Sequence, residues 1–194
     1  MRVTIHQPEH FPYMGFFQKM TKADLFIILD DVQFKKNNWQ NRNRIKNKAG
    51  QDEWITIPVP KKSTSQKINE VMVSDDPHWR SKILKKFKYN FSFDATPLYE
   101  PSKLIDINMN SIFWAMEKLK INKPIVMASE ISNQGQKTQR LINLLKEVGA
   151  TTYISGPSGK NYLDMELFGN IEVEFFEPQV KNYYSCAYNI LKGL

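Results

Sequence analysis

The order of strand-like and helix-like segments is the strongest constraint on the fold of this chain. Residues 2–6 read as a short buried strand, and residues 14–23 have the apolar spacing of a helix. Residues 24–31 then form an apolar run of strand length that ends in two aspartates. A strand, a turn, a helix and a strand within about thirty residues predict a βαβ unit with a right-handed crossover.

The second half of the chain repeats this order. Strand character returns at residues 124–129, and residues 136–150 read as an amphipathic helix that Gly149 stops. Strands are expected at 151–156 and 171–177. Strand-helix-strand order at both ends predicts an α/β fold with a mainly parallel, Rossmann-like sheet.

The middle of the chain has a different pattern. Residues 39–59 read as an antiparallel hairpin whose turn is Ala49-Gly50, and a short strand is expected at 68–73. Residues 77–91 favour a helix that begins near Pro77, and residues 98–119 favour one interrupted helix or two helices. We therefore expect a single domain over residues 1–194, with a hairpin and a helical insertion at about 36–120.

Polar residues cluster where the predicted parallel strands end. His6 and Gln7 lie at the end of the first predicted strand, and Asp30 and Asp31 lie at the end of the second. In open parallel sheets, ligands bind beyond the carboxyl ends of the strands. These four residues are the candidate catalytic residues, since a histidine or an aspartate can accept a proton and an amide can stabilise an oxyanion. Because neighbouring side chains of a strand point to opposite faces, only one of the two aspartates is expected to face a given ligand.

The first loop is stiffened by Pro8 and Pro12, and Gly15 permits close approach of the backbone at the helix entry. A phosphate could bind to the amides that follow. His6 and His10 fit either a phosphate-binding or catalytic role or that of hydrogen-bonded turn residues.

The first arm of the predicted hairpin alternates amide and arginine side chains. Asn41 and Asn43 are expected on one face, and Arg42 and Arg44 on the other. All four are candidate substrate-binding residues, because arginine forms bidentate contacts with phosphate or carboxylate. The alternative is a solvated hairpin face.

The loop at residues 154–164 contains further candidates for substrate binding, namely Ser158, Lys160 and Tyr162. It lacks the spacing of a Walker A loop, so any phosphate contact here would be of another kind. Ser-Gly-Pro is also an ordinary turn sequence.

The formal net charge of +7 favours anionic partners. The expected substrate is an anionic small molecule such as a sugar nucleotide. The aromatic tail could form a homodimer surface or a binding wall, although packing against the core is the favoured use. No DNA partner is expected because no nucleic-acid motif is recognisable, and no zinc-ligand spacing occurs. The cofactor is left unknown. One cysteine, no signal-peptide pattern and no membrane span predict a cytoplasmic location.

Five stretches together resemble the WbqC-like proteins, and their order covers most of the chain. They are HQPEHFPYMGFF, ADLFIILDDVQF, NRNRI, ITIPV and KTQRLINLLKEVGATTYISGPSGKNYLD. Members of this family are encoded in bacterial O-antigen and other surface-polysaccharide gene clusters. The resemblance implies transfer of glycine or another amino acid onto an amino sugar.

The leading hypothesis is therefore an enzyme of surface-polysaccharide synthesis that acylates the amine of a nucleotide-linked amino sugar. One alternative is ATP-dependent nucleotidyl transfer or adenylation. The other is a non-catalytic scaffold of the polysaccharide machinery. All catalytic assignments assume that the first loop, the two aspartates and the arginine hairpin share one cleft.

Overall fold

The structure is a computed structural model that describes residues 1–131 and 134–194. The chain forms two compact units, each assembled from three segments of the sequence. Unit 1 consists of Met1–Gln7, Gly15–Asp31 and Asn122–Lys181, and unit 2 of Pro8–Met14, Val32–Ile121 and Asn182–Leu194. The single domain expected over residues 1–194 stays a prediction.

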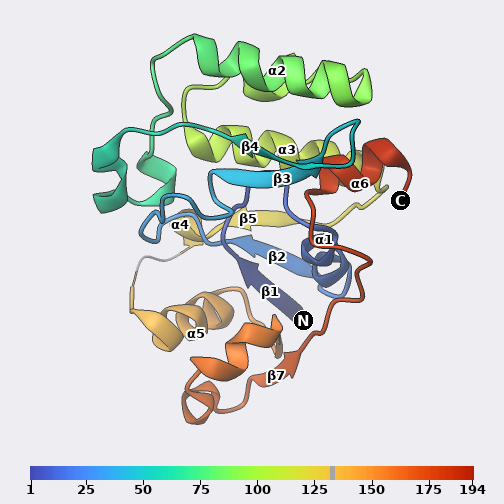
Figure 1. Cartoon of the computed structure of the whole chain (residues 1–194). Coiled ribbons are helices and arrows are strands. Elements are labelled where there is room, and N and C mark those ends of the chain that lie inside the picture. Colours follow the sequence, from blue (N-terminus) through green and yellow to red (C-terminus); the bar gives the residue numbers. More distant parts are fainter. Residues whose placement is uncertain (132–133) are drawn as a thin grey trace. The chain divides into compact units, whose positions relative to one another are not determined.

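Unit 1 is built on a five-stranded sheet in which every neighbouring pair is parallel (Figure 1). Its order is β5-β2-β1-β6-β7. The strands are β1 (Arg2–His6), β2 (Leu25–Ile28), β5 (Ile125–Met127), β6 (Thr152–Ser155) and β7 (Glu172–Phe175). Ranked along the chain within unit 1, this order is 3-2-1-4-5, which is the Rossmann order without a sixth strand. The prediction of a parallel Rossmann-like sheet is confirmed.

Helices cover both faces of this sheet, as its apolar strands require. On one face, α1 (Met14–Thr21) places the Phe16 ring 4.9 Å from that of Phe26 on β2. On the other face, α5 (Lys137–Glu147) buries an apolar stripe against Val3 and Ile5 of β1. The short helices of unit 1 are α4 (Ala128–Ile131), η4 (Pro157–Asn161) and η5 (Met165–Phe168).

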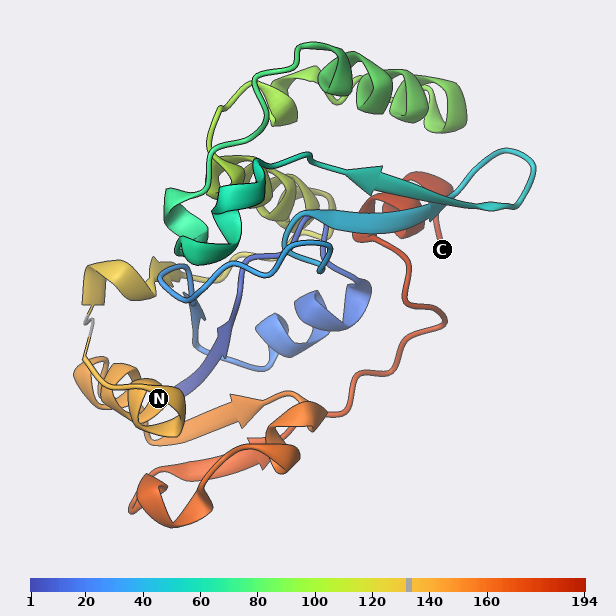
Figure 2. The ribbon, with the colours of Figure 1, turned by 60° about the vertical axis from the view of Figure 1, so that its left-hand side comes forward.

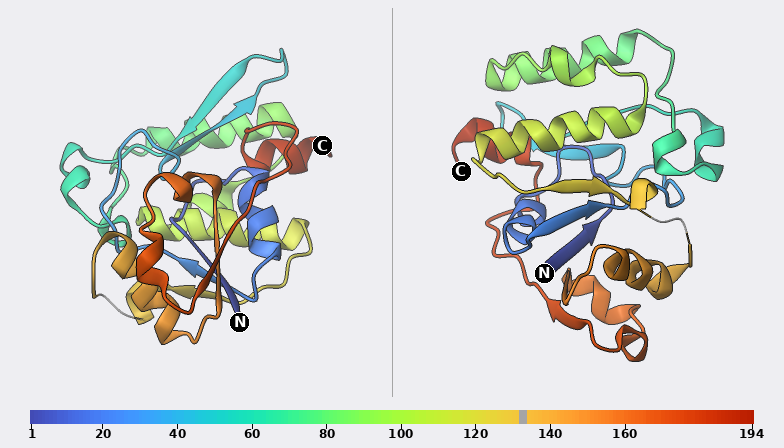
Figure 3. Two further views of the ribbon diagram at one scale, coloured as in Figure 1. Left: turned by 90° about the horizontal axis from the view of Figure 1, so that it is seen from below. Right: turned by 180° about the vertical axis from the view of Figure 1, so that it is seen from behind.

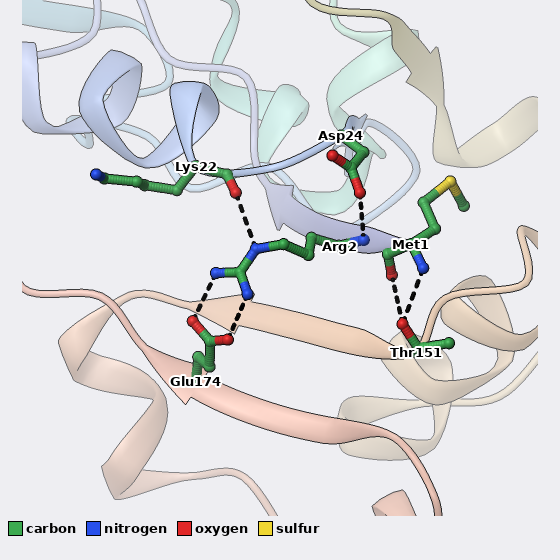
Figure 4. Close-up of polar contacts among 6 residues, drawn as sticks. All are labelled: Met1, Arg2, Lys22, Asp24, Thr151 and Glu174. Carbon is green, nitrogen blue, oxygen red and sulfur yellow. Dashed lines mark hydrogen bonds and ion pairs between the residues drawn. The ribbon is translucent and has the colours of Figure 1, made fainter.

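An arginine ties the first strand to the last strand of the sheet. Arg2 donates from Nη1 and Nη2 to the two carboxylate oxygens of Glu174, at 2.5 and 2.6 Å (Figure 4). Its Nε donates to the carbonyl of Lys22 at 3.2 Å. This two-pronged geometry is the one that guanidinium and carboxylate groups prefer.

Unit 2 contains an antiparallel hairpin of β3 (Arg42–Lys46) and β4 (Asp52–Thr56), which Figure 2 shows with its connecting turn. Gly50 has a φ of 78° in that turn, a conformation that glycine adopts without strain. The predicted hairpin and its turn are therefore confirmed.

Two longer helices of unit 2, α2 (His78–Phe91) and α3 (Leu104–Lys118), confirm the helices expected in the middle of the chain (Figures 1 and 3). The remaining helices are α6 (Cys186–Lys192), η1 (Lys61–Ser65), η2 (Ile68–Glu70) and η3 (Thr96–Tyr99). Within the described ranges, no helix combines the length and the apolar character that crossing a membrane requires.

The strand expected at residues 68–73 is wrong. Residues Ile68–Glu70 form the 3₁₀ turn η2, because Glu70 Oε2 accepts a hydrogen bond from the Lys67 amide at 3.0 Å. Within residues 68–73, Met72 alone makes a β-bridge to a described residue, Lys103. A local side-chain bond to the backbone thus overrides the β propensity of this short run.

Candidate functional site

The carboxyl edge of the unit 1 sheet contains the point at which the strand order reverses. This point lies between β1 and β6, which are neighbours in the sheet although about 150 residues separate them in sequence. The chain continues from β1 towards α1 on one face, whereas α5 leads into β6 from the other face. In doubly wound sheets such a switch point opens the crevice in which ligands bind.

His6 and Gln7 stand at the end of β1, on one side of the switch point. The His6 ring packs edge-on against Phe16, with ring centroids 4.9 Å apart, and its Nδ1 lies 3.0 Å from the Gln7 carbonyl oxygen. Burial and, to a smaller extent, the charge of Lys19 lower the pKa of His6 from 6.5 to about 3. The ring is therefore neutral at pH 7. Since a carbonyl only accepts, Nδ1 carries the proton and Nε2 is the acceptor.

Asp30 follows β2 and is 2% exposed. Its two carboxylate oxygens accept hydrogen bonds from Ser129, one from the amide at 3.0 Å and one from the hydroxyl at 2.7 Å. Because Ser129 follows β5, this pair joins the ends of two neighbouring strands.

Asp31 binds a different partner from Asp30, as expected for neighbouring residues whose side chains point to opposite faces. Its Oδ2 accepts a hydrogen bond from Arg140 Nη2 at 2.6 Å, and both side chains are 7% exposed. Asp31 Oδ1 and Arg140 Nη1 are buried, and neither has a hydrogen-bond partner among the described residues. Burying polar atoms in this state costs free energy unless another group satisfies them. A polar ligand group at this edge of the sheet could do so.

Arg140 was not among the candidate residues from the sequence. It lies in the first turn of α5, one helical turn before Leu144, on the stripe that α5 buries. A charged residue on the apolar stripe of an amphipathic helix is the signal that could have identified it.

Ser158, Lys160 and Tyr162 lie on the other side of the switch point, in and just after η4. All three are exposed, and Lys160 Nζ is 5.5 Å from the centre of the Phe175 ring. The structure thus places seven candidate residues at the carboxyl edge of one sheet: His6, Gln7, Asp30, Asp31, Ser158, Lys160 and Tyr162.

The two glycines of this loop have different roles. A Cβ at Gly159 would collide with Ser155 Oγ and lie 3.2 Å from Ser155 Cβ, whereas a Cβ at Gly156 would meet nothing within 4 Å. We expect Gly159→Ala to lower the free energy of unfolding by about 1–3 kcal/mol through overpacking. Gly156→Ala is the matched control and should change it by less than about 0.5 kcal/mol. Urea unfolding measures both, and equal effects would contradict this reading.

The hairpin candidates belong to unit 2. Asn41 and Asn43 are each 1% exposed, and their Nδ2 atoms donate to backbone carbonyls, that of Asn41 to Ile57 at 2.9 Å and that of Asn43 to Phe11 at 2.8 Å. Arg42 and Arg44 lie on the opposite, partly exposed face, as the alternation predicts. Of these four candidates, the arginines are therefore the ones that a ligand can reach.

His10 also belongs to unit 2, and it is fully buried. Its Nε2 lies 2.9 Å from the Tyr99 hydroxyl, and its Nδ1 has no partner among the described residues. Burial lowers the pKa of His10 to about 3 and raises that of Tyr99 well above 10. The ring is therefore neutral, and its hydrogen bond with the Tyr99 hydroxyl inside the core is the geometry of a structural residue.

Within the described residues, no group of three or more histidine, cysteine, aspartate or glutamate side chains is arranged to hold a metal ion.

Comparison with known proteins assigns the chain to a family. The sequence profile of the WbqC-like protein family matches residues 7–190. The chain belongs to the WbqC-like protein family. Among curated proteins, it is 32% identical over 185 residues to the uncharacterized protein Rv1507c of Mycobacterium tuberculosis, a match that covers 89% of this chain and 79% of that protein. No solved structure matches this WbqC-like chain.

Proposed function

We propose that this WbqC-like protein is a transferase of bacterial surface-polysaccharide synthesis. It joins an amino acid such as glycine, or another acyl group, to the amine of a nucleotide-linked amino sugar. Membership of the WbqC-like family supports the assignment to surface-polysaccharide synthesis. The observation that carries the chemistry is the neutral His6 imidazole at the switch point of the parallel sheet.

The reaction forms a C–N bond between the sugar amine and the acyl carbonyl carbon, and it breaks the bond from that carbon to the donor's oxygen or sulfur. The amine must be neutral to attack. His6 Nε2 accepts a hydrogen bond from the amine and takes its proton as the tetrahedral intermediate forms, then returns it to the leaving group. A pKa of about 3 makes His6 a weak base, so its main contribution is to orient the amine.

The remaining edge residues supply charge and hydrogen bonds. The Gln7 amide stabilises the developing oxyanion. Asp30 positions the Ser129 hydroxyl, and the Asp31–Arg140 pair offers one acceptor and one donor to polar groups of the substrate. Ser158, Lys160 and Tyr162 bind the phosphates and the sugar on the other side of the switch point. Anion binding by Arg42 and Arg44 in unit 2 is a separate proposal.

The direct test incubates the purified chain with a nucleotide-linked amino sugar and a glycyl thioester and follows the glycylated product by mass spectrometry. We expect His6→Gln to lower the rate by about 10²-fold or more. His78→Gln is the matched control, since His78 is exposed at the start of α2, and it should leave the rate unchanged.

Two outcomes would replace the proposal. Exchange of pyrophosphate into ATP, in the absence of acceptor, would indicate adenylation instead. Absence of turnover with every nucleotide-linked amino sugar, together with co-purification with a glycosyltransferase, would indicate a scaffold. Equal rates for the wild type and His6→Gln would remove His6 from the mechanism.

A further inference from the structure

One face of the hairpin in unit 2 combines cations with exposed aromatic rings. Strand β3 places Arg42, Arg44 and Lys46 at alternate positions, so that their side chains share a face. The cross-strand register sets Trp54 opposite Arg44 on this face. We call the following six residues the cation–aromatic face: Trp39, Arg42, Arg44, Lys46, Trp54 and Tyr184.

The members of this face stack on one another. The Arg42 guanidinium lies 4.3 Å from the centre of the Trp54 ring, and the Trp39 ring stacks on Trp54 with centroids 6.2 Å apart and an angle of 28°. Arg44 lies 5.7 Å from Trp54 and 5.6 Å from Tyr184, and Lys46 lies 5.4 Å from Tyr184. The contacts form a continuous row of cations and rings along the strand.

This row is still open to solvent. Trp39 is 39% exposed and Trp54 is 40% exposed, although indole rings are among the side chains that gain most from burial. Stacking within the row holds the two rings together, and more than a third of each tryptophan stays exposed. An ordered, exposed pair of tryptophans is a feature of recognition surfaces.

The charge of the row is unbalanced. Asp52 is opposite Lys46, and it accepts hydrogen bonds from Arg44 Nη1 at 3.3 Å and from the Tyr184 hydroxyl at 2.6 Å. The face thus carries three cations for one carboxylate. Arg44 Nε is buried and has no hydrogen-bond partner among the described residues. The face is therefore suited to a partner that brings several negative charges.

The spacing of the cations indicates that the ligand is a polymer. Alternate residues of a strand lie roughly 6.7 Å apart, so Arg42, Arg44 and Lys46 form a straight, regular row. A small molecule usually binds in a concave site, whereas this surface is one side of a two-stranded hairpin. A polymer with a regular series of phosphates and with flat bases matches both the charges and the rings.

We propose that the cation–aromatic face binds single-stranded nucleic acid. The bases stack on Trp39 and Trp54, and the phosphates contact Arg42, Arg44 and Lys46. The inference goes beyond the proposed transfer reaction and does not depend on it, because binding needs neither the sugar acceptor nor the acyl donor.

The test measures binding of the full chain to a fluorescently labelled single-stranded 12-mer of RNA, by fluorescence polarisation over a range of salt concentrations. Neutralising about three phosphates predicts a slope of log affinity against log salt of about −2, and Arg44→Gln should reduce its magnitude by about 0.7. Trp39→Leu and Trp54→Leu should each weaken binding by about ten-fold or more, since each removes a stacking ring. The 12-mer should also quench tryptophan fluorescence in the wild type.

Two control variants are matched to these changes. Phe113→Leu removes an aromatic ring that is 52% exposed on α3, and Lys146→Gln removes an exposed cation in the last turn of α5. Both should bind the 12-mer as the wild type does. Trp39 lies outside the strands of the hairpin, so Trp39→Leu keeps the test valid if Trp54→Leu fails to fold.

Further ligands distinguish binding of single-stranded nucleic acid from other kinds of anion binding. A single-stranded DNA of the same sequence shows which nucleic acid binds more tightly and tests the expectation that DNA is no partner. Equal affinity for duplex RNA or for a sulfated polysaccharide would overturn the proposal, because neither offers unstacked bases. Equal affinity for a free nucleoside diphosphate would also overturn it, in favour of a mononucleotide site. Loss of binding in the control variants would identify non-specific attraction to a basic protein.

Discussion

Acidification from pH 7 to pH 3 should remove about 4 kcal/mol of the free energy of unfolding through His10 alone. The pKa of His10 is about 3 in the folded chain, against 6.5 for an exposed histidine. Between these pH values the unfolded state binds the proton and the folded state does not, so stability falls as the pH falls. Above about pH 7.5 the ring is neutral in both states, and His10 contributes no pH dependence.

Urea unfolding at several pH values between 7 and 4 measures this effect. His10→Gln should be less stable at pH 7 and should lose less stability on acidification than the wild type. The His10→Gln variant should still lose stability on acidification, because it keeps His6, whose pKa in the folded chain is also about 3. His78→Gln changes an exposed histidine and should reproduce the wild-type curve. Parallel curves for wild type and His10→Gln would show that His10 titrates normally in the folded chain.

Arg140→Ala should lower the free energy of unfolding by about 3–5 kcal/mol. The substitution leaves the Asp31 carboxylate buried without its guanidinium partner, and Asp31 and Arg140 are each only 7% exposed. The double variant Asp31→Leu with Arg140→Met should recover most of the loss, because an apolar pair of similar size needs no charge partner. Thermal and urea unfolding measure both variants.

Lys146→Ala is the matched control on the same helix. Lys146 is exposed in the last turn of α5, so its removal should change the free energy of unfolding by less than about 0.5 kcal/mol. If the double variant were as unstable as Arg140→Ala, the loss would come from packing around α5 rather than from an uncompensated charge.

The sequence predicts the sheet of unit 1 well because its strands are short, apolar and separated by helices of clear periodicity. The hairpin was predictable for a similar reason, since Ala49-Gly50 supplies a turn between two alternating arms. The failure at residues 68–73 came from a local hydrogen bond of Glu70, which competes with strand formation and has no periodic signature.

The candidate site was predicted in part. Rules on strand ends predicted that His6, Asp30 and Asp31 lie at the carboxyl edge of the sheet, since this depends only on local sequence. Their catalytic roles stay predictions. The partners of the aspartates depend on which strands and helices become neighbours. Ser129 and Arg140 approach them from about 100 residues away in the sequence. No local pattern contains that information, and the convergence of the hairpin arginines on the same cleft stays a prediction.

The position of β1 in the sheet has a consequence for synthesis of the chain. A ribosome releases β1 and β2 first, but the other edge of β1 pairs with β6 at residues 152–154. At about 5–20 residues per second, this edge stays unpaired for roughly 6–25 seconds of translation. Unit 2 also needs Asn182–Leu194. Nascent chains halted before residue 150 should therefore expose an open strand edge and depend on chaperones, because neither unit can close.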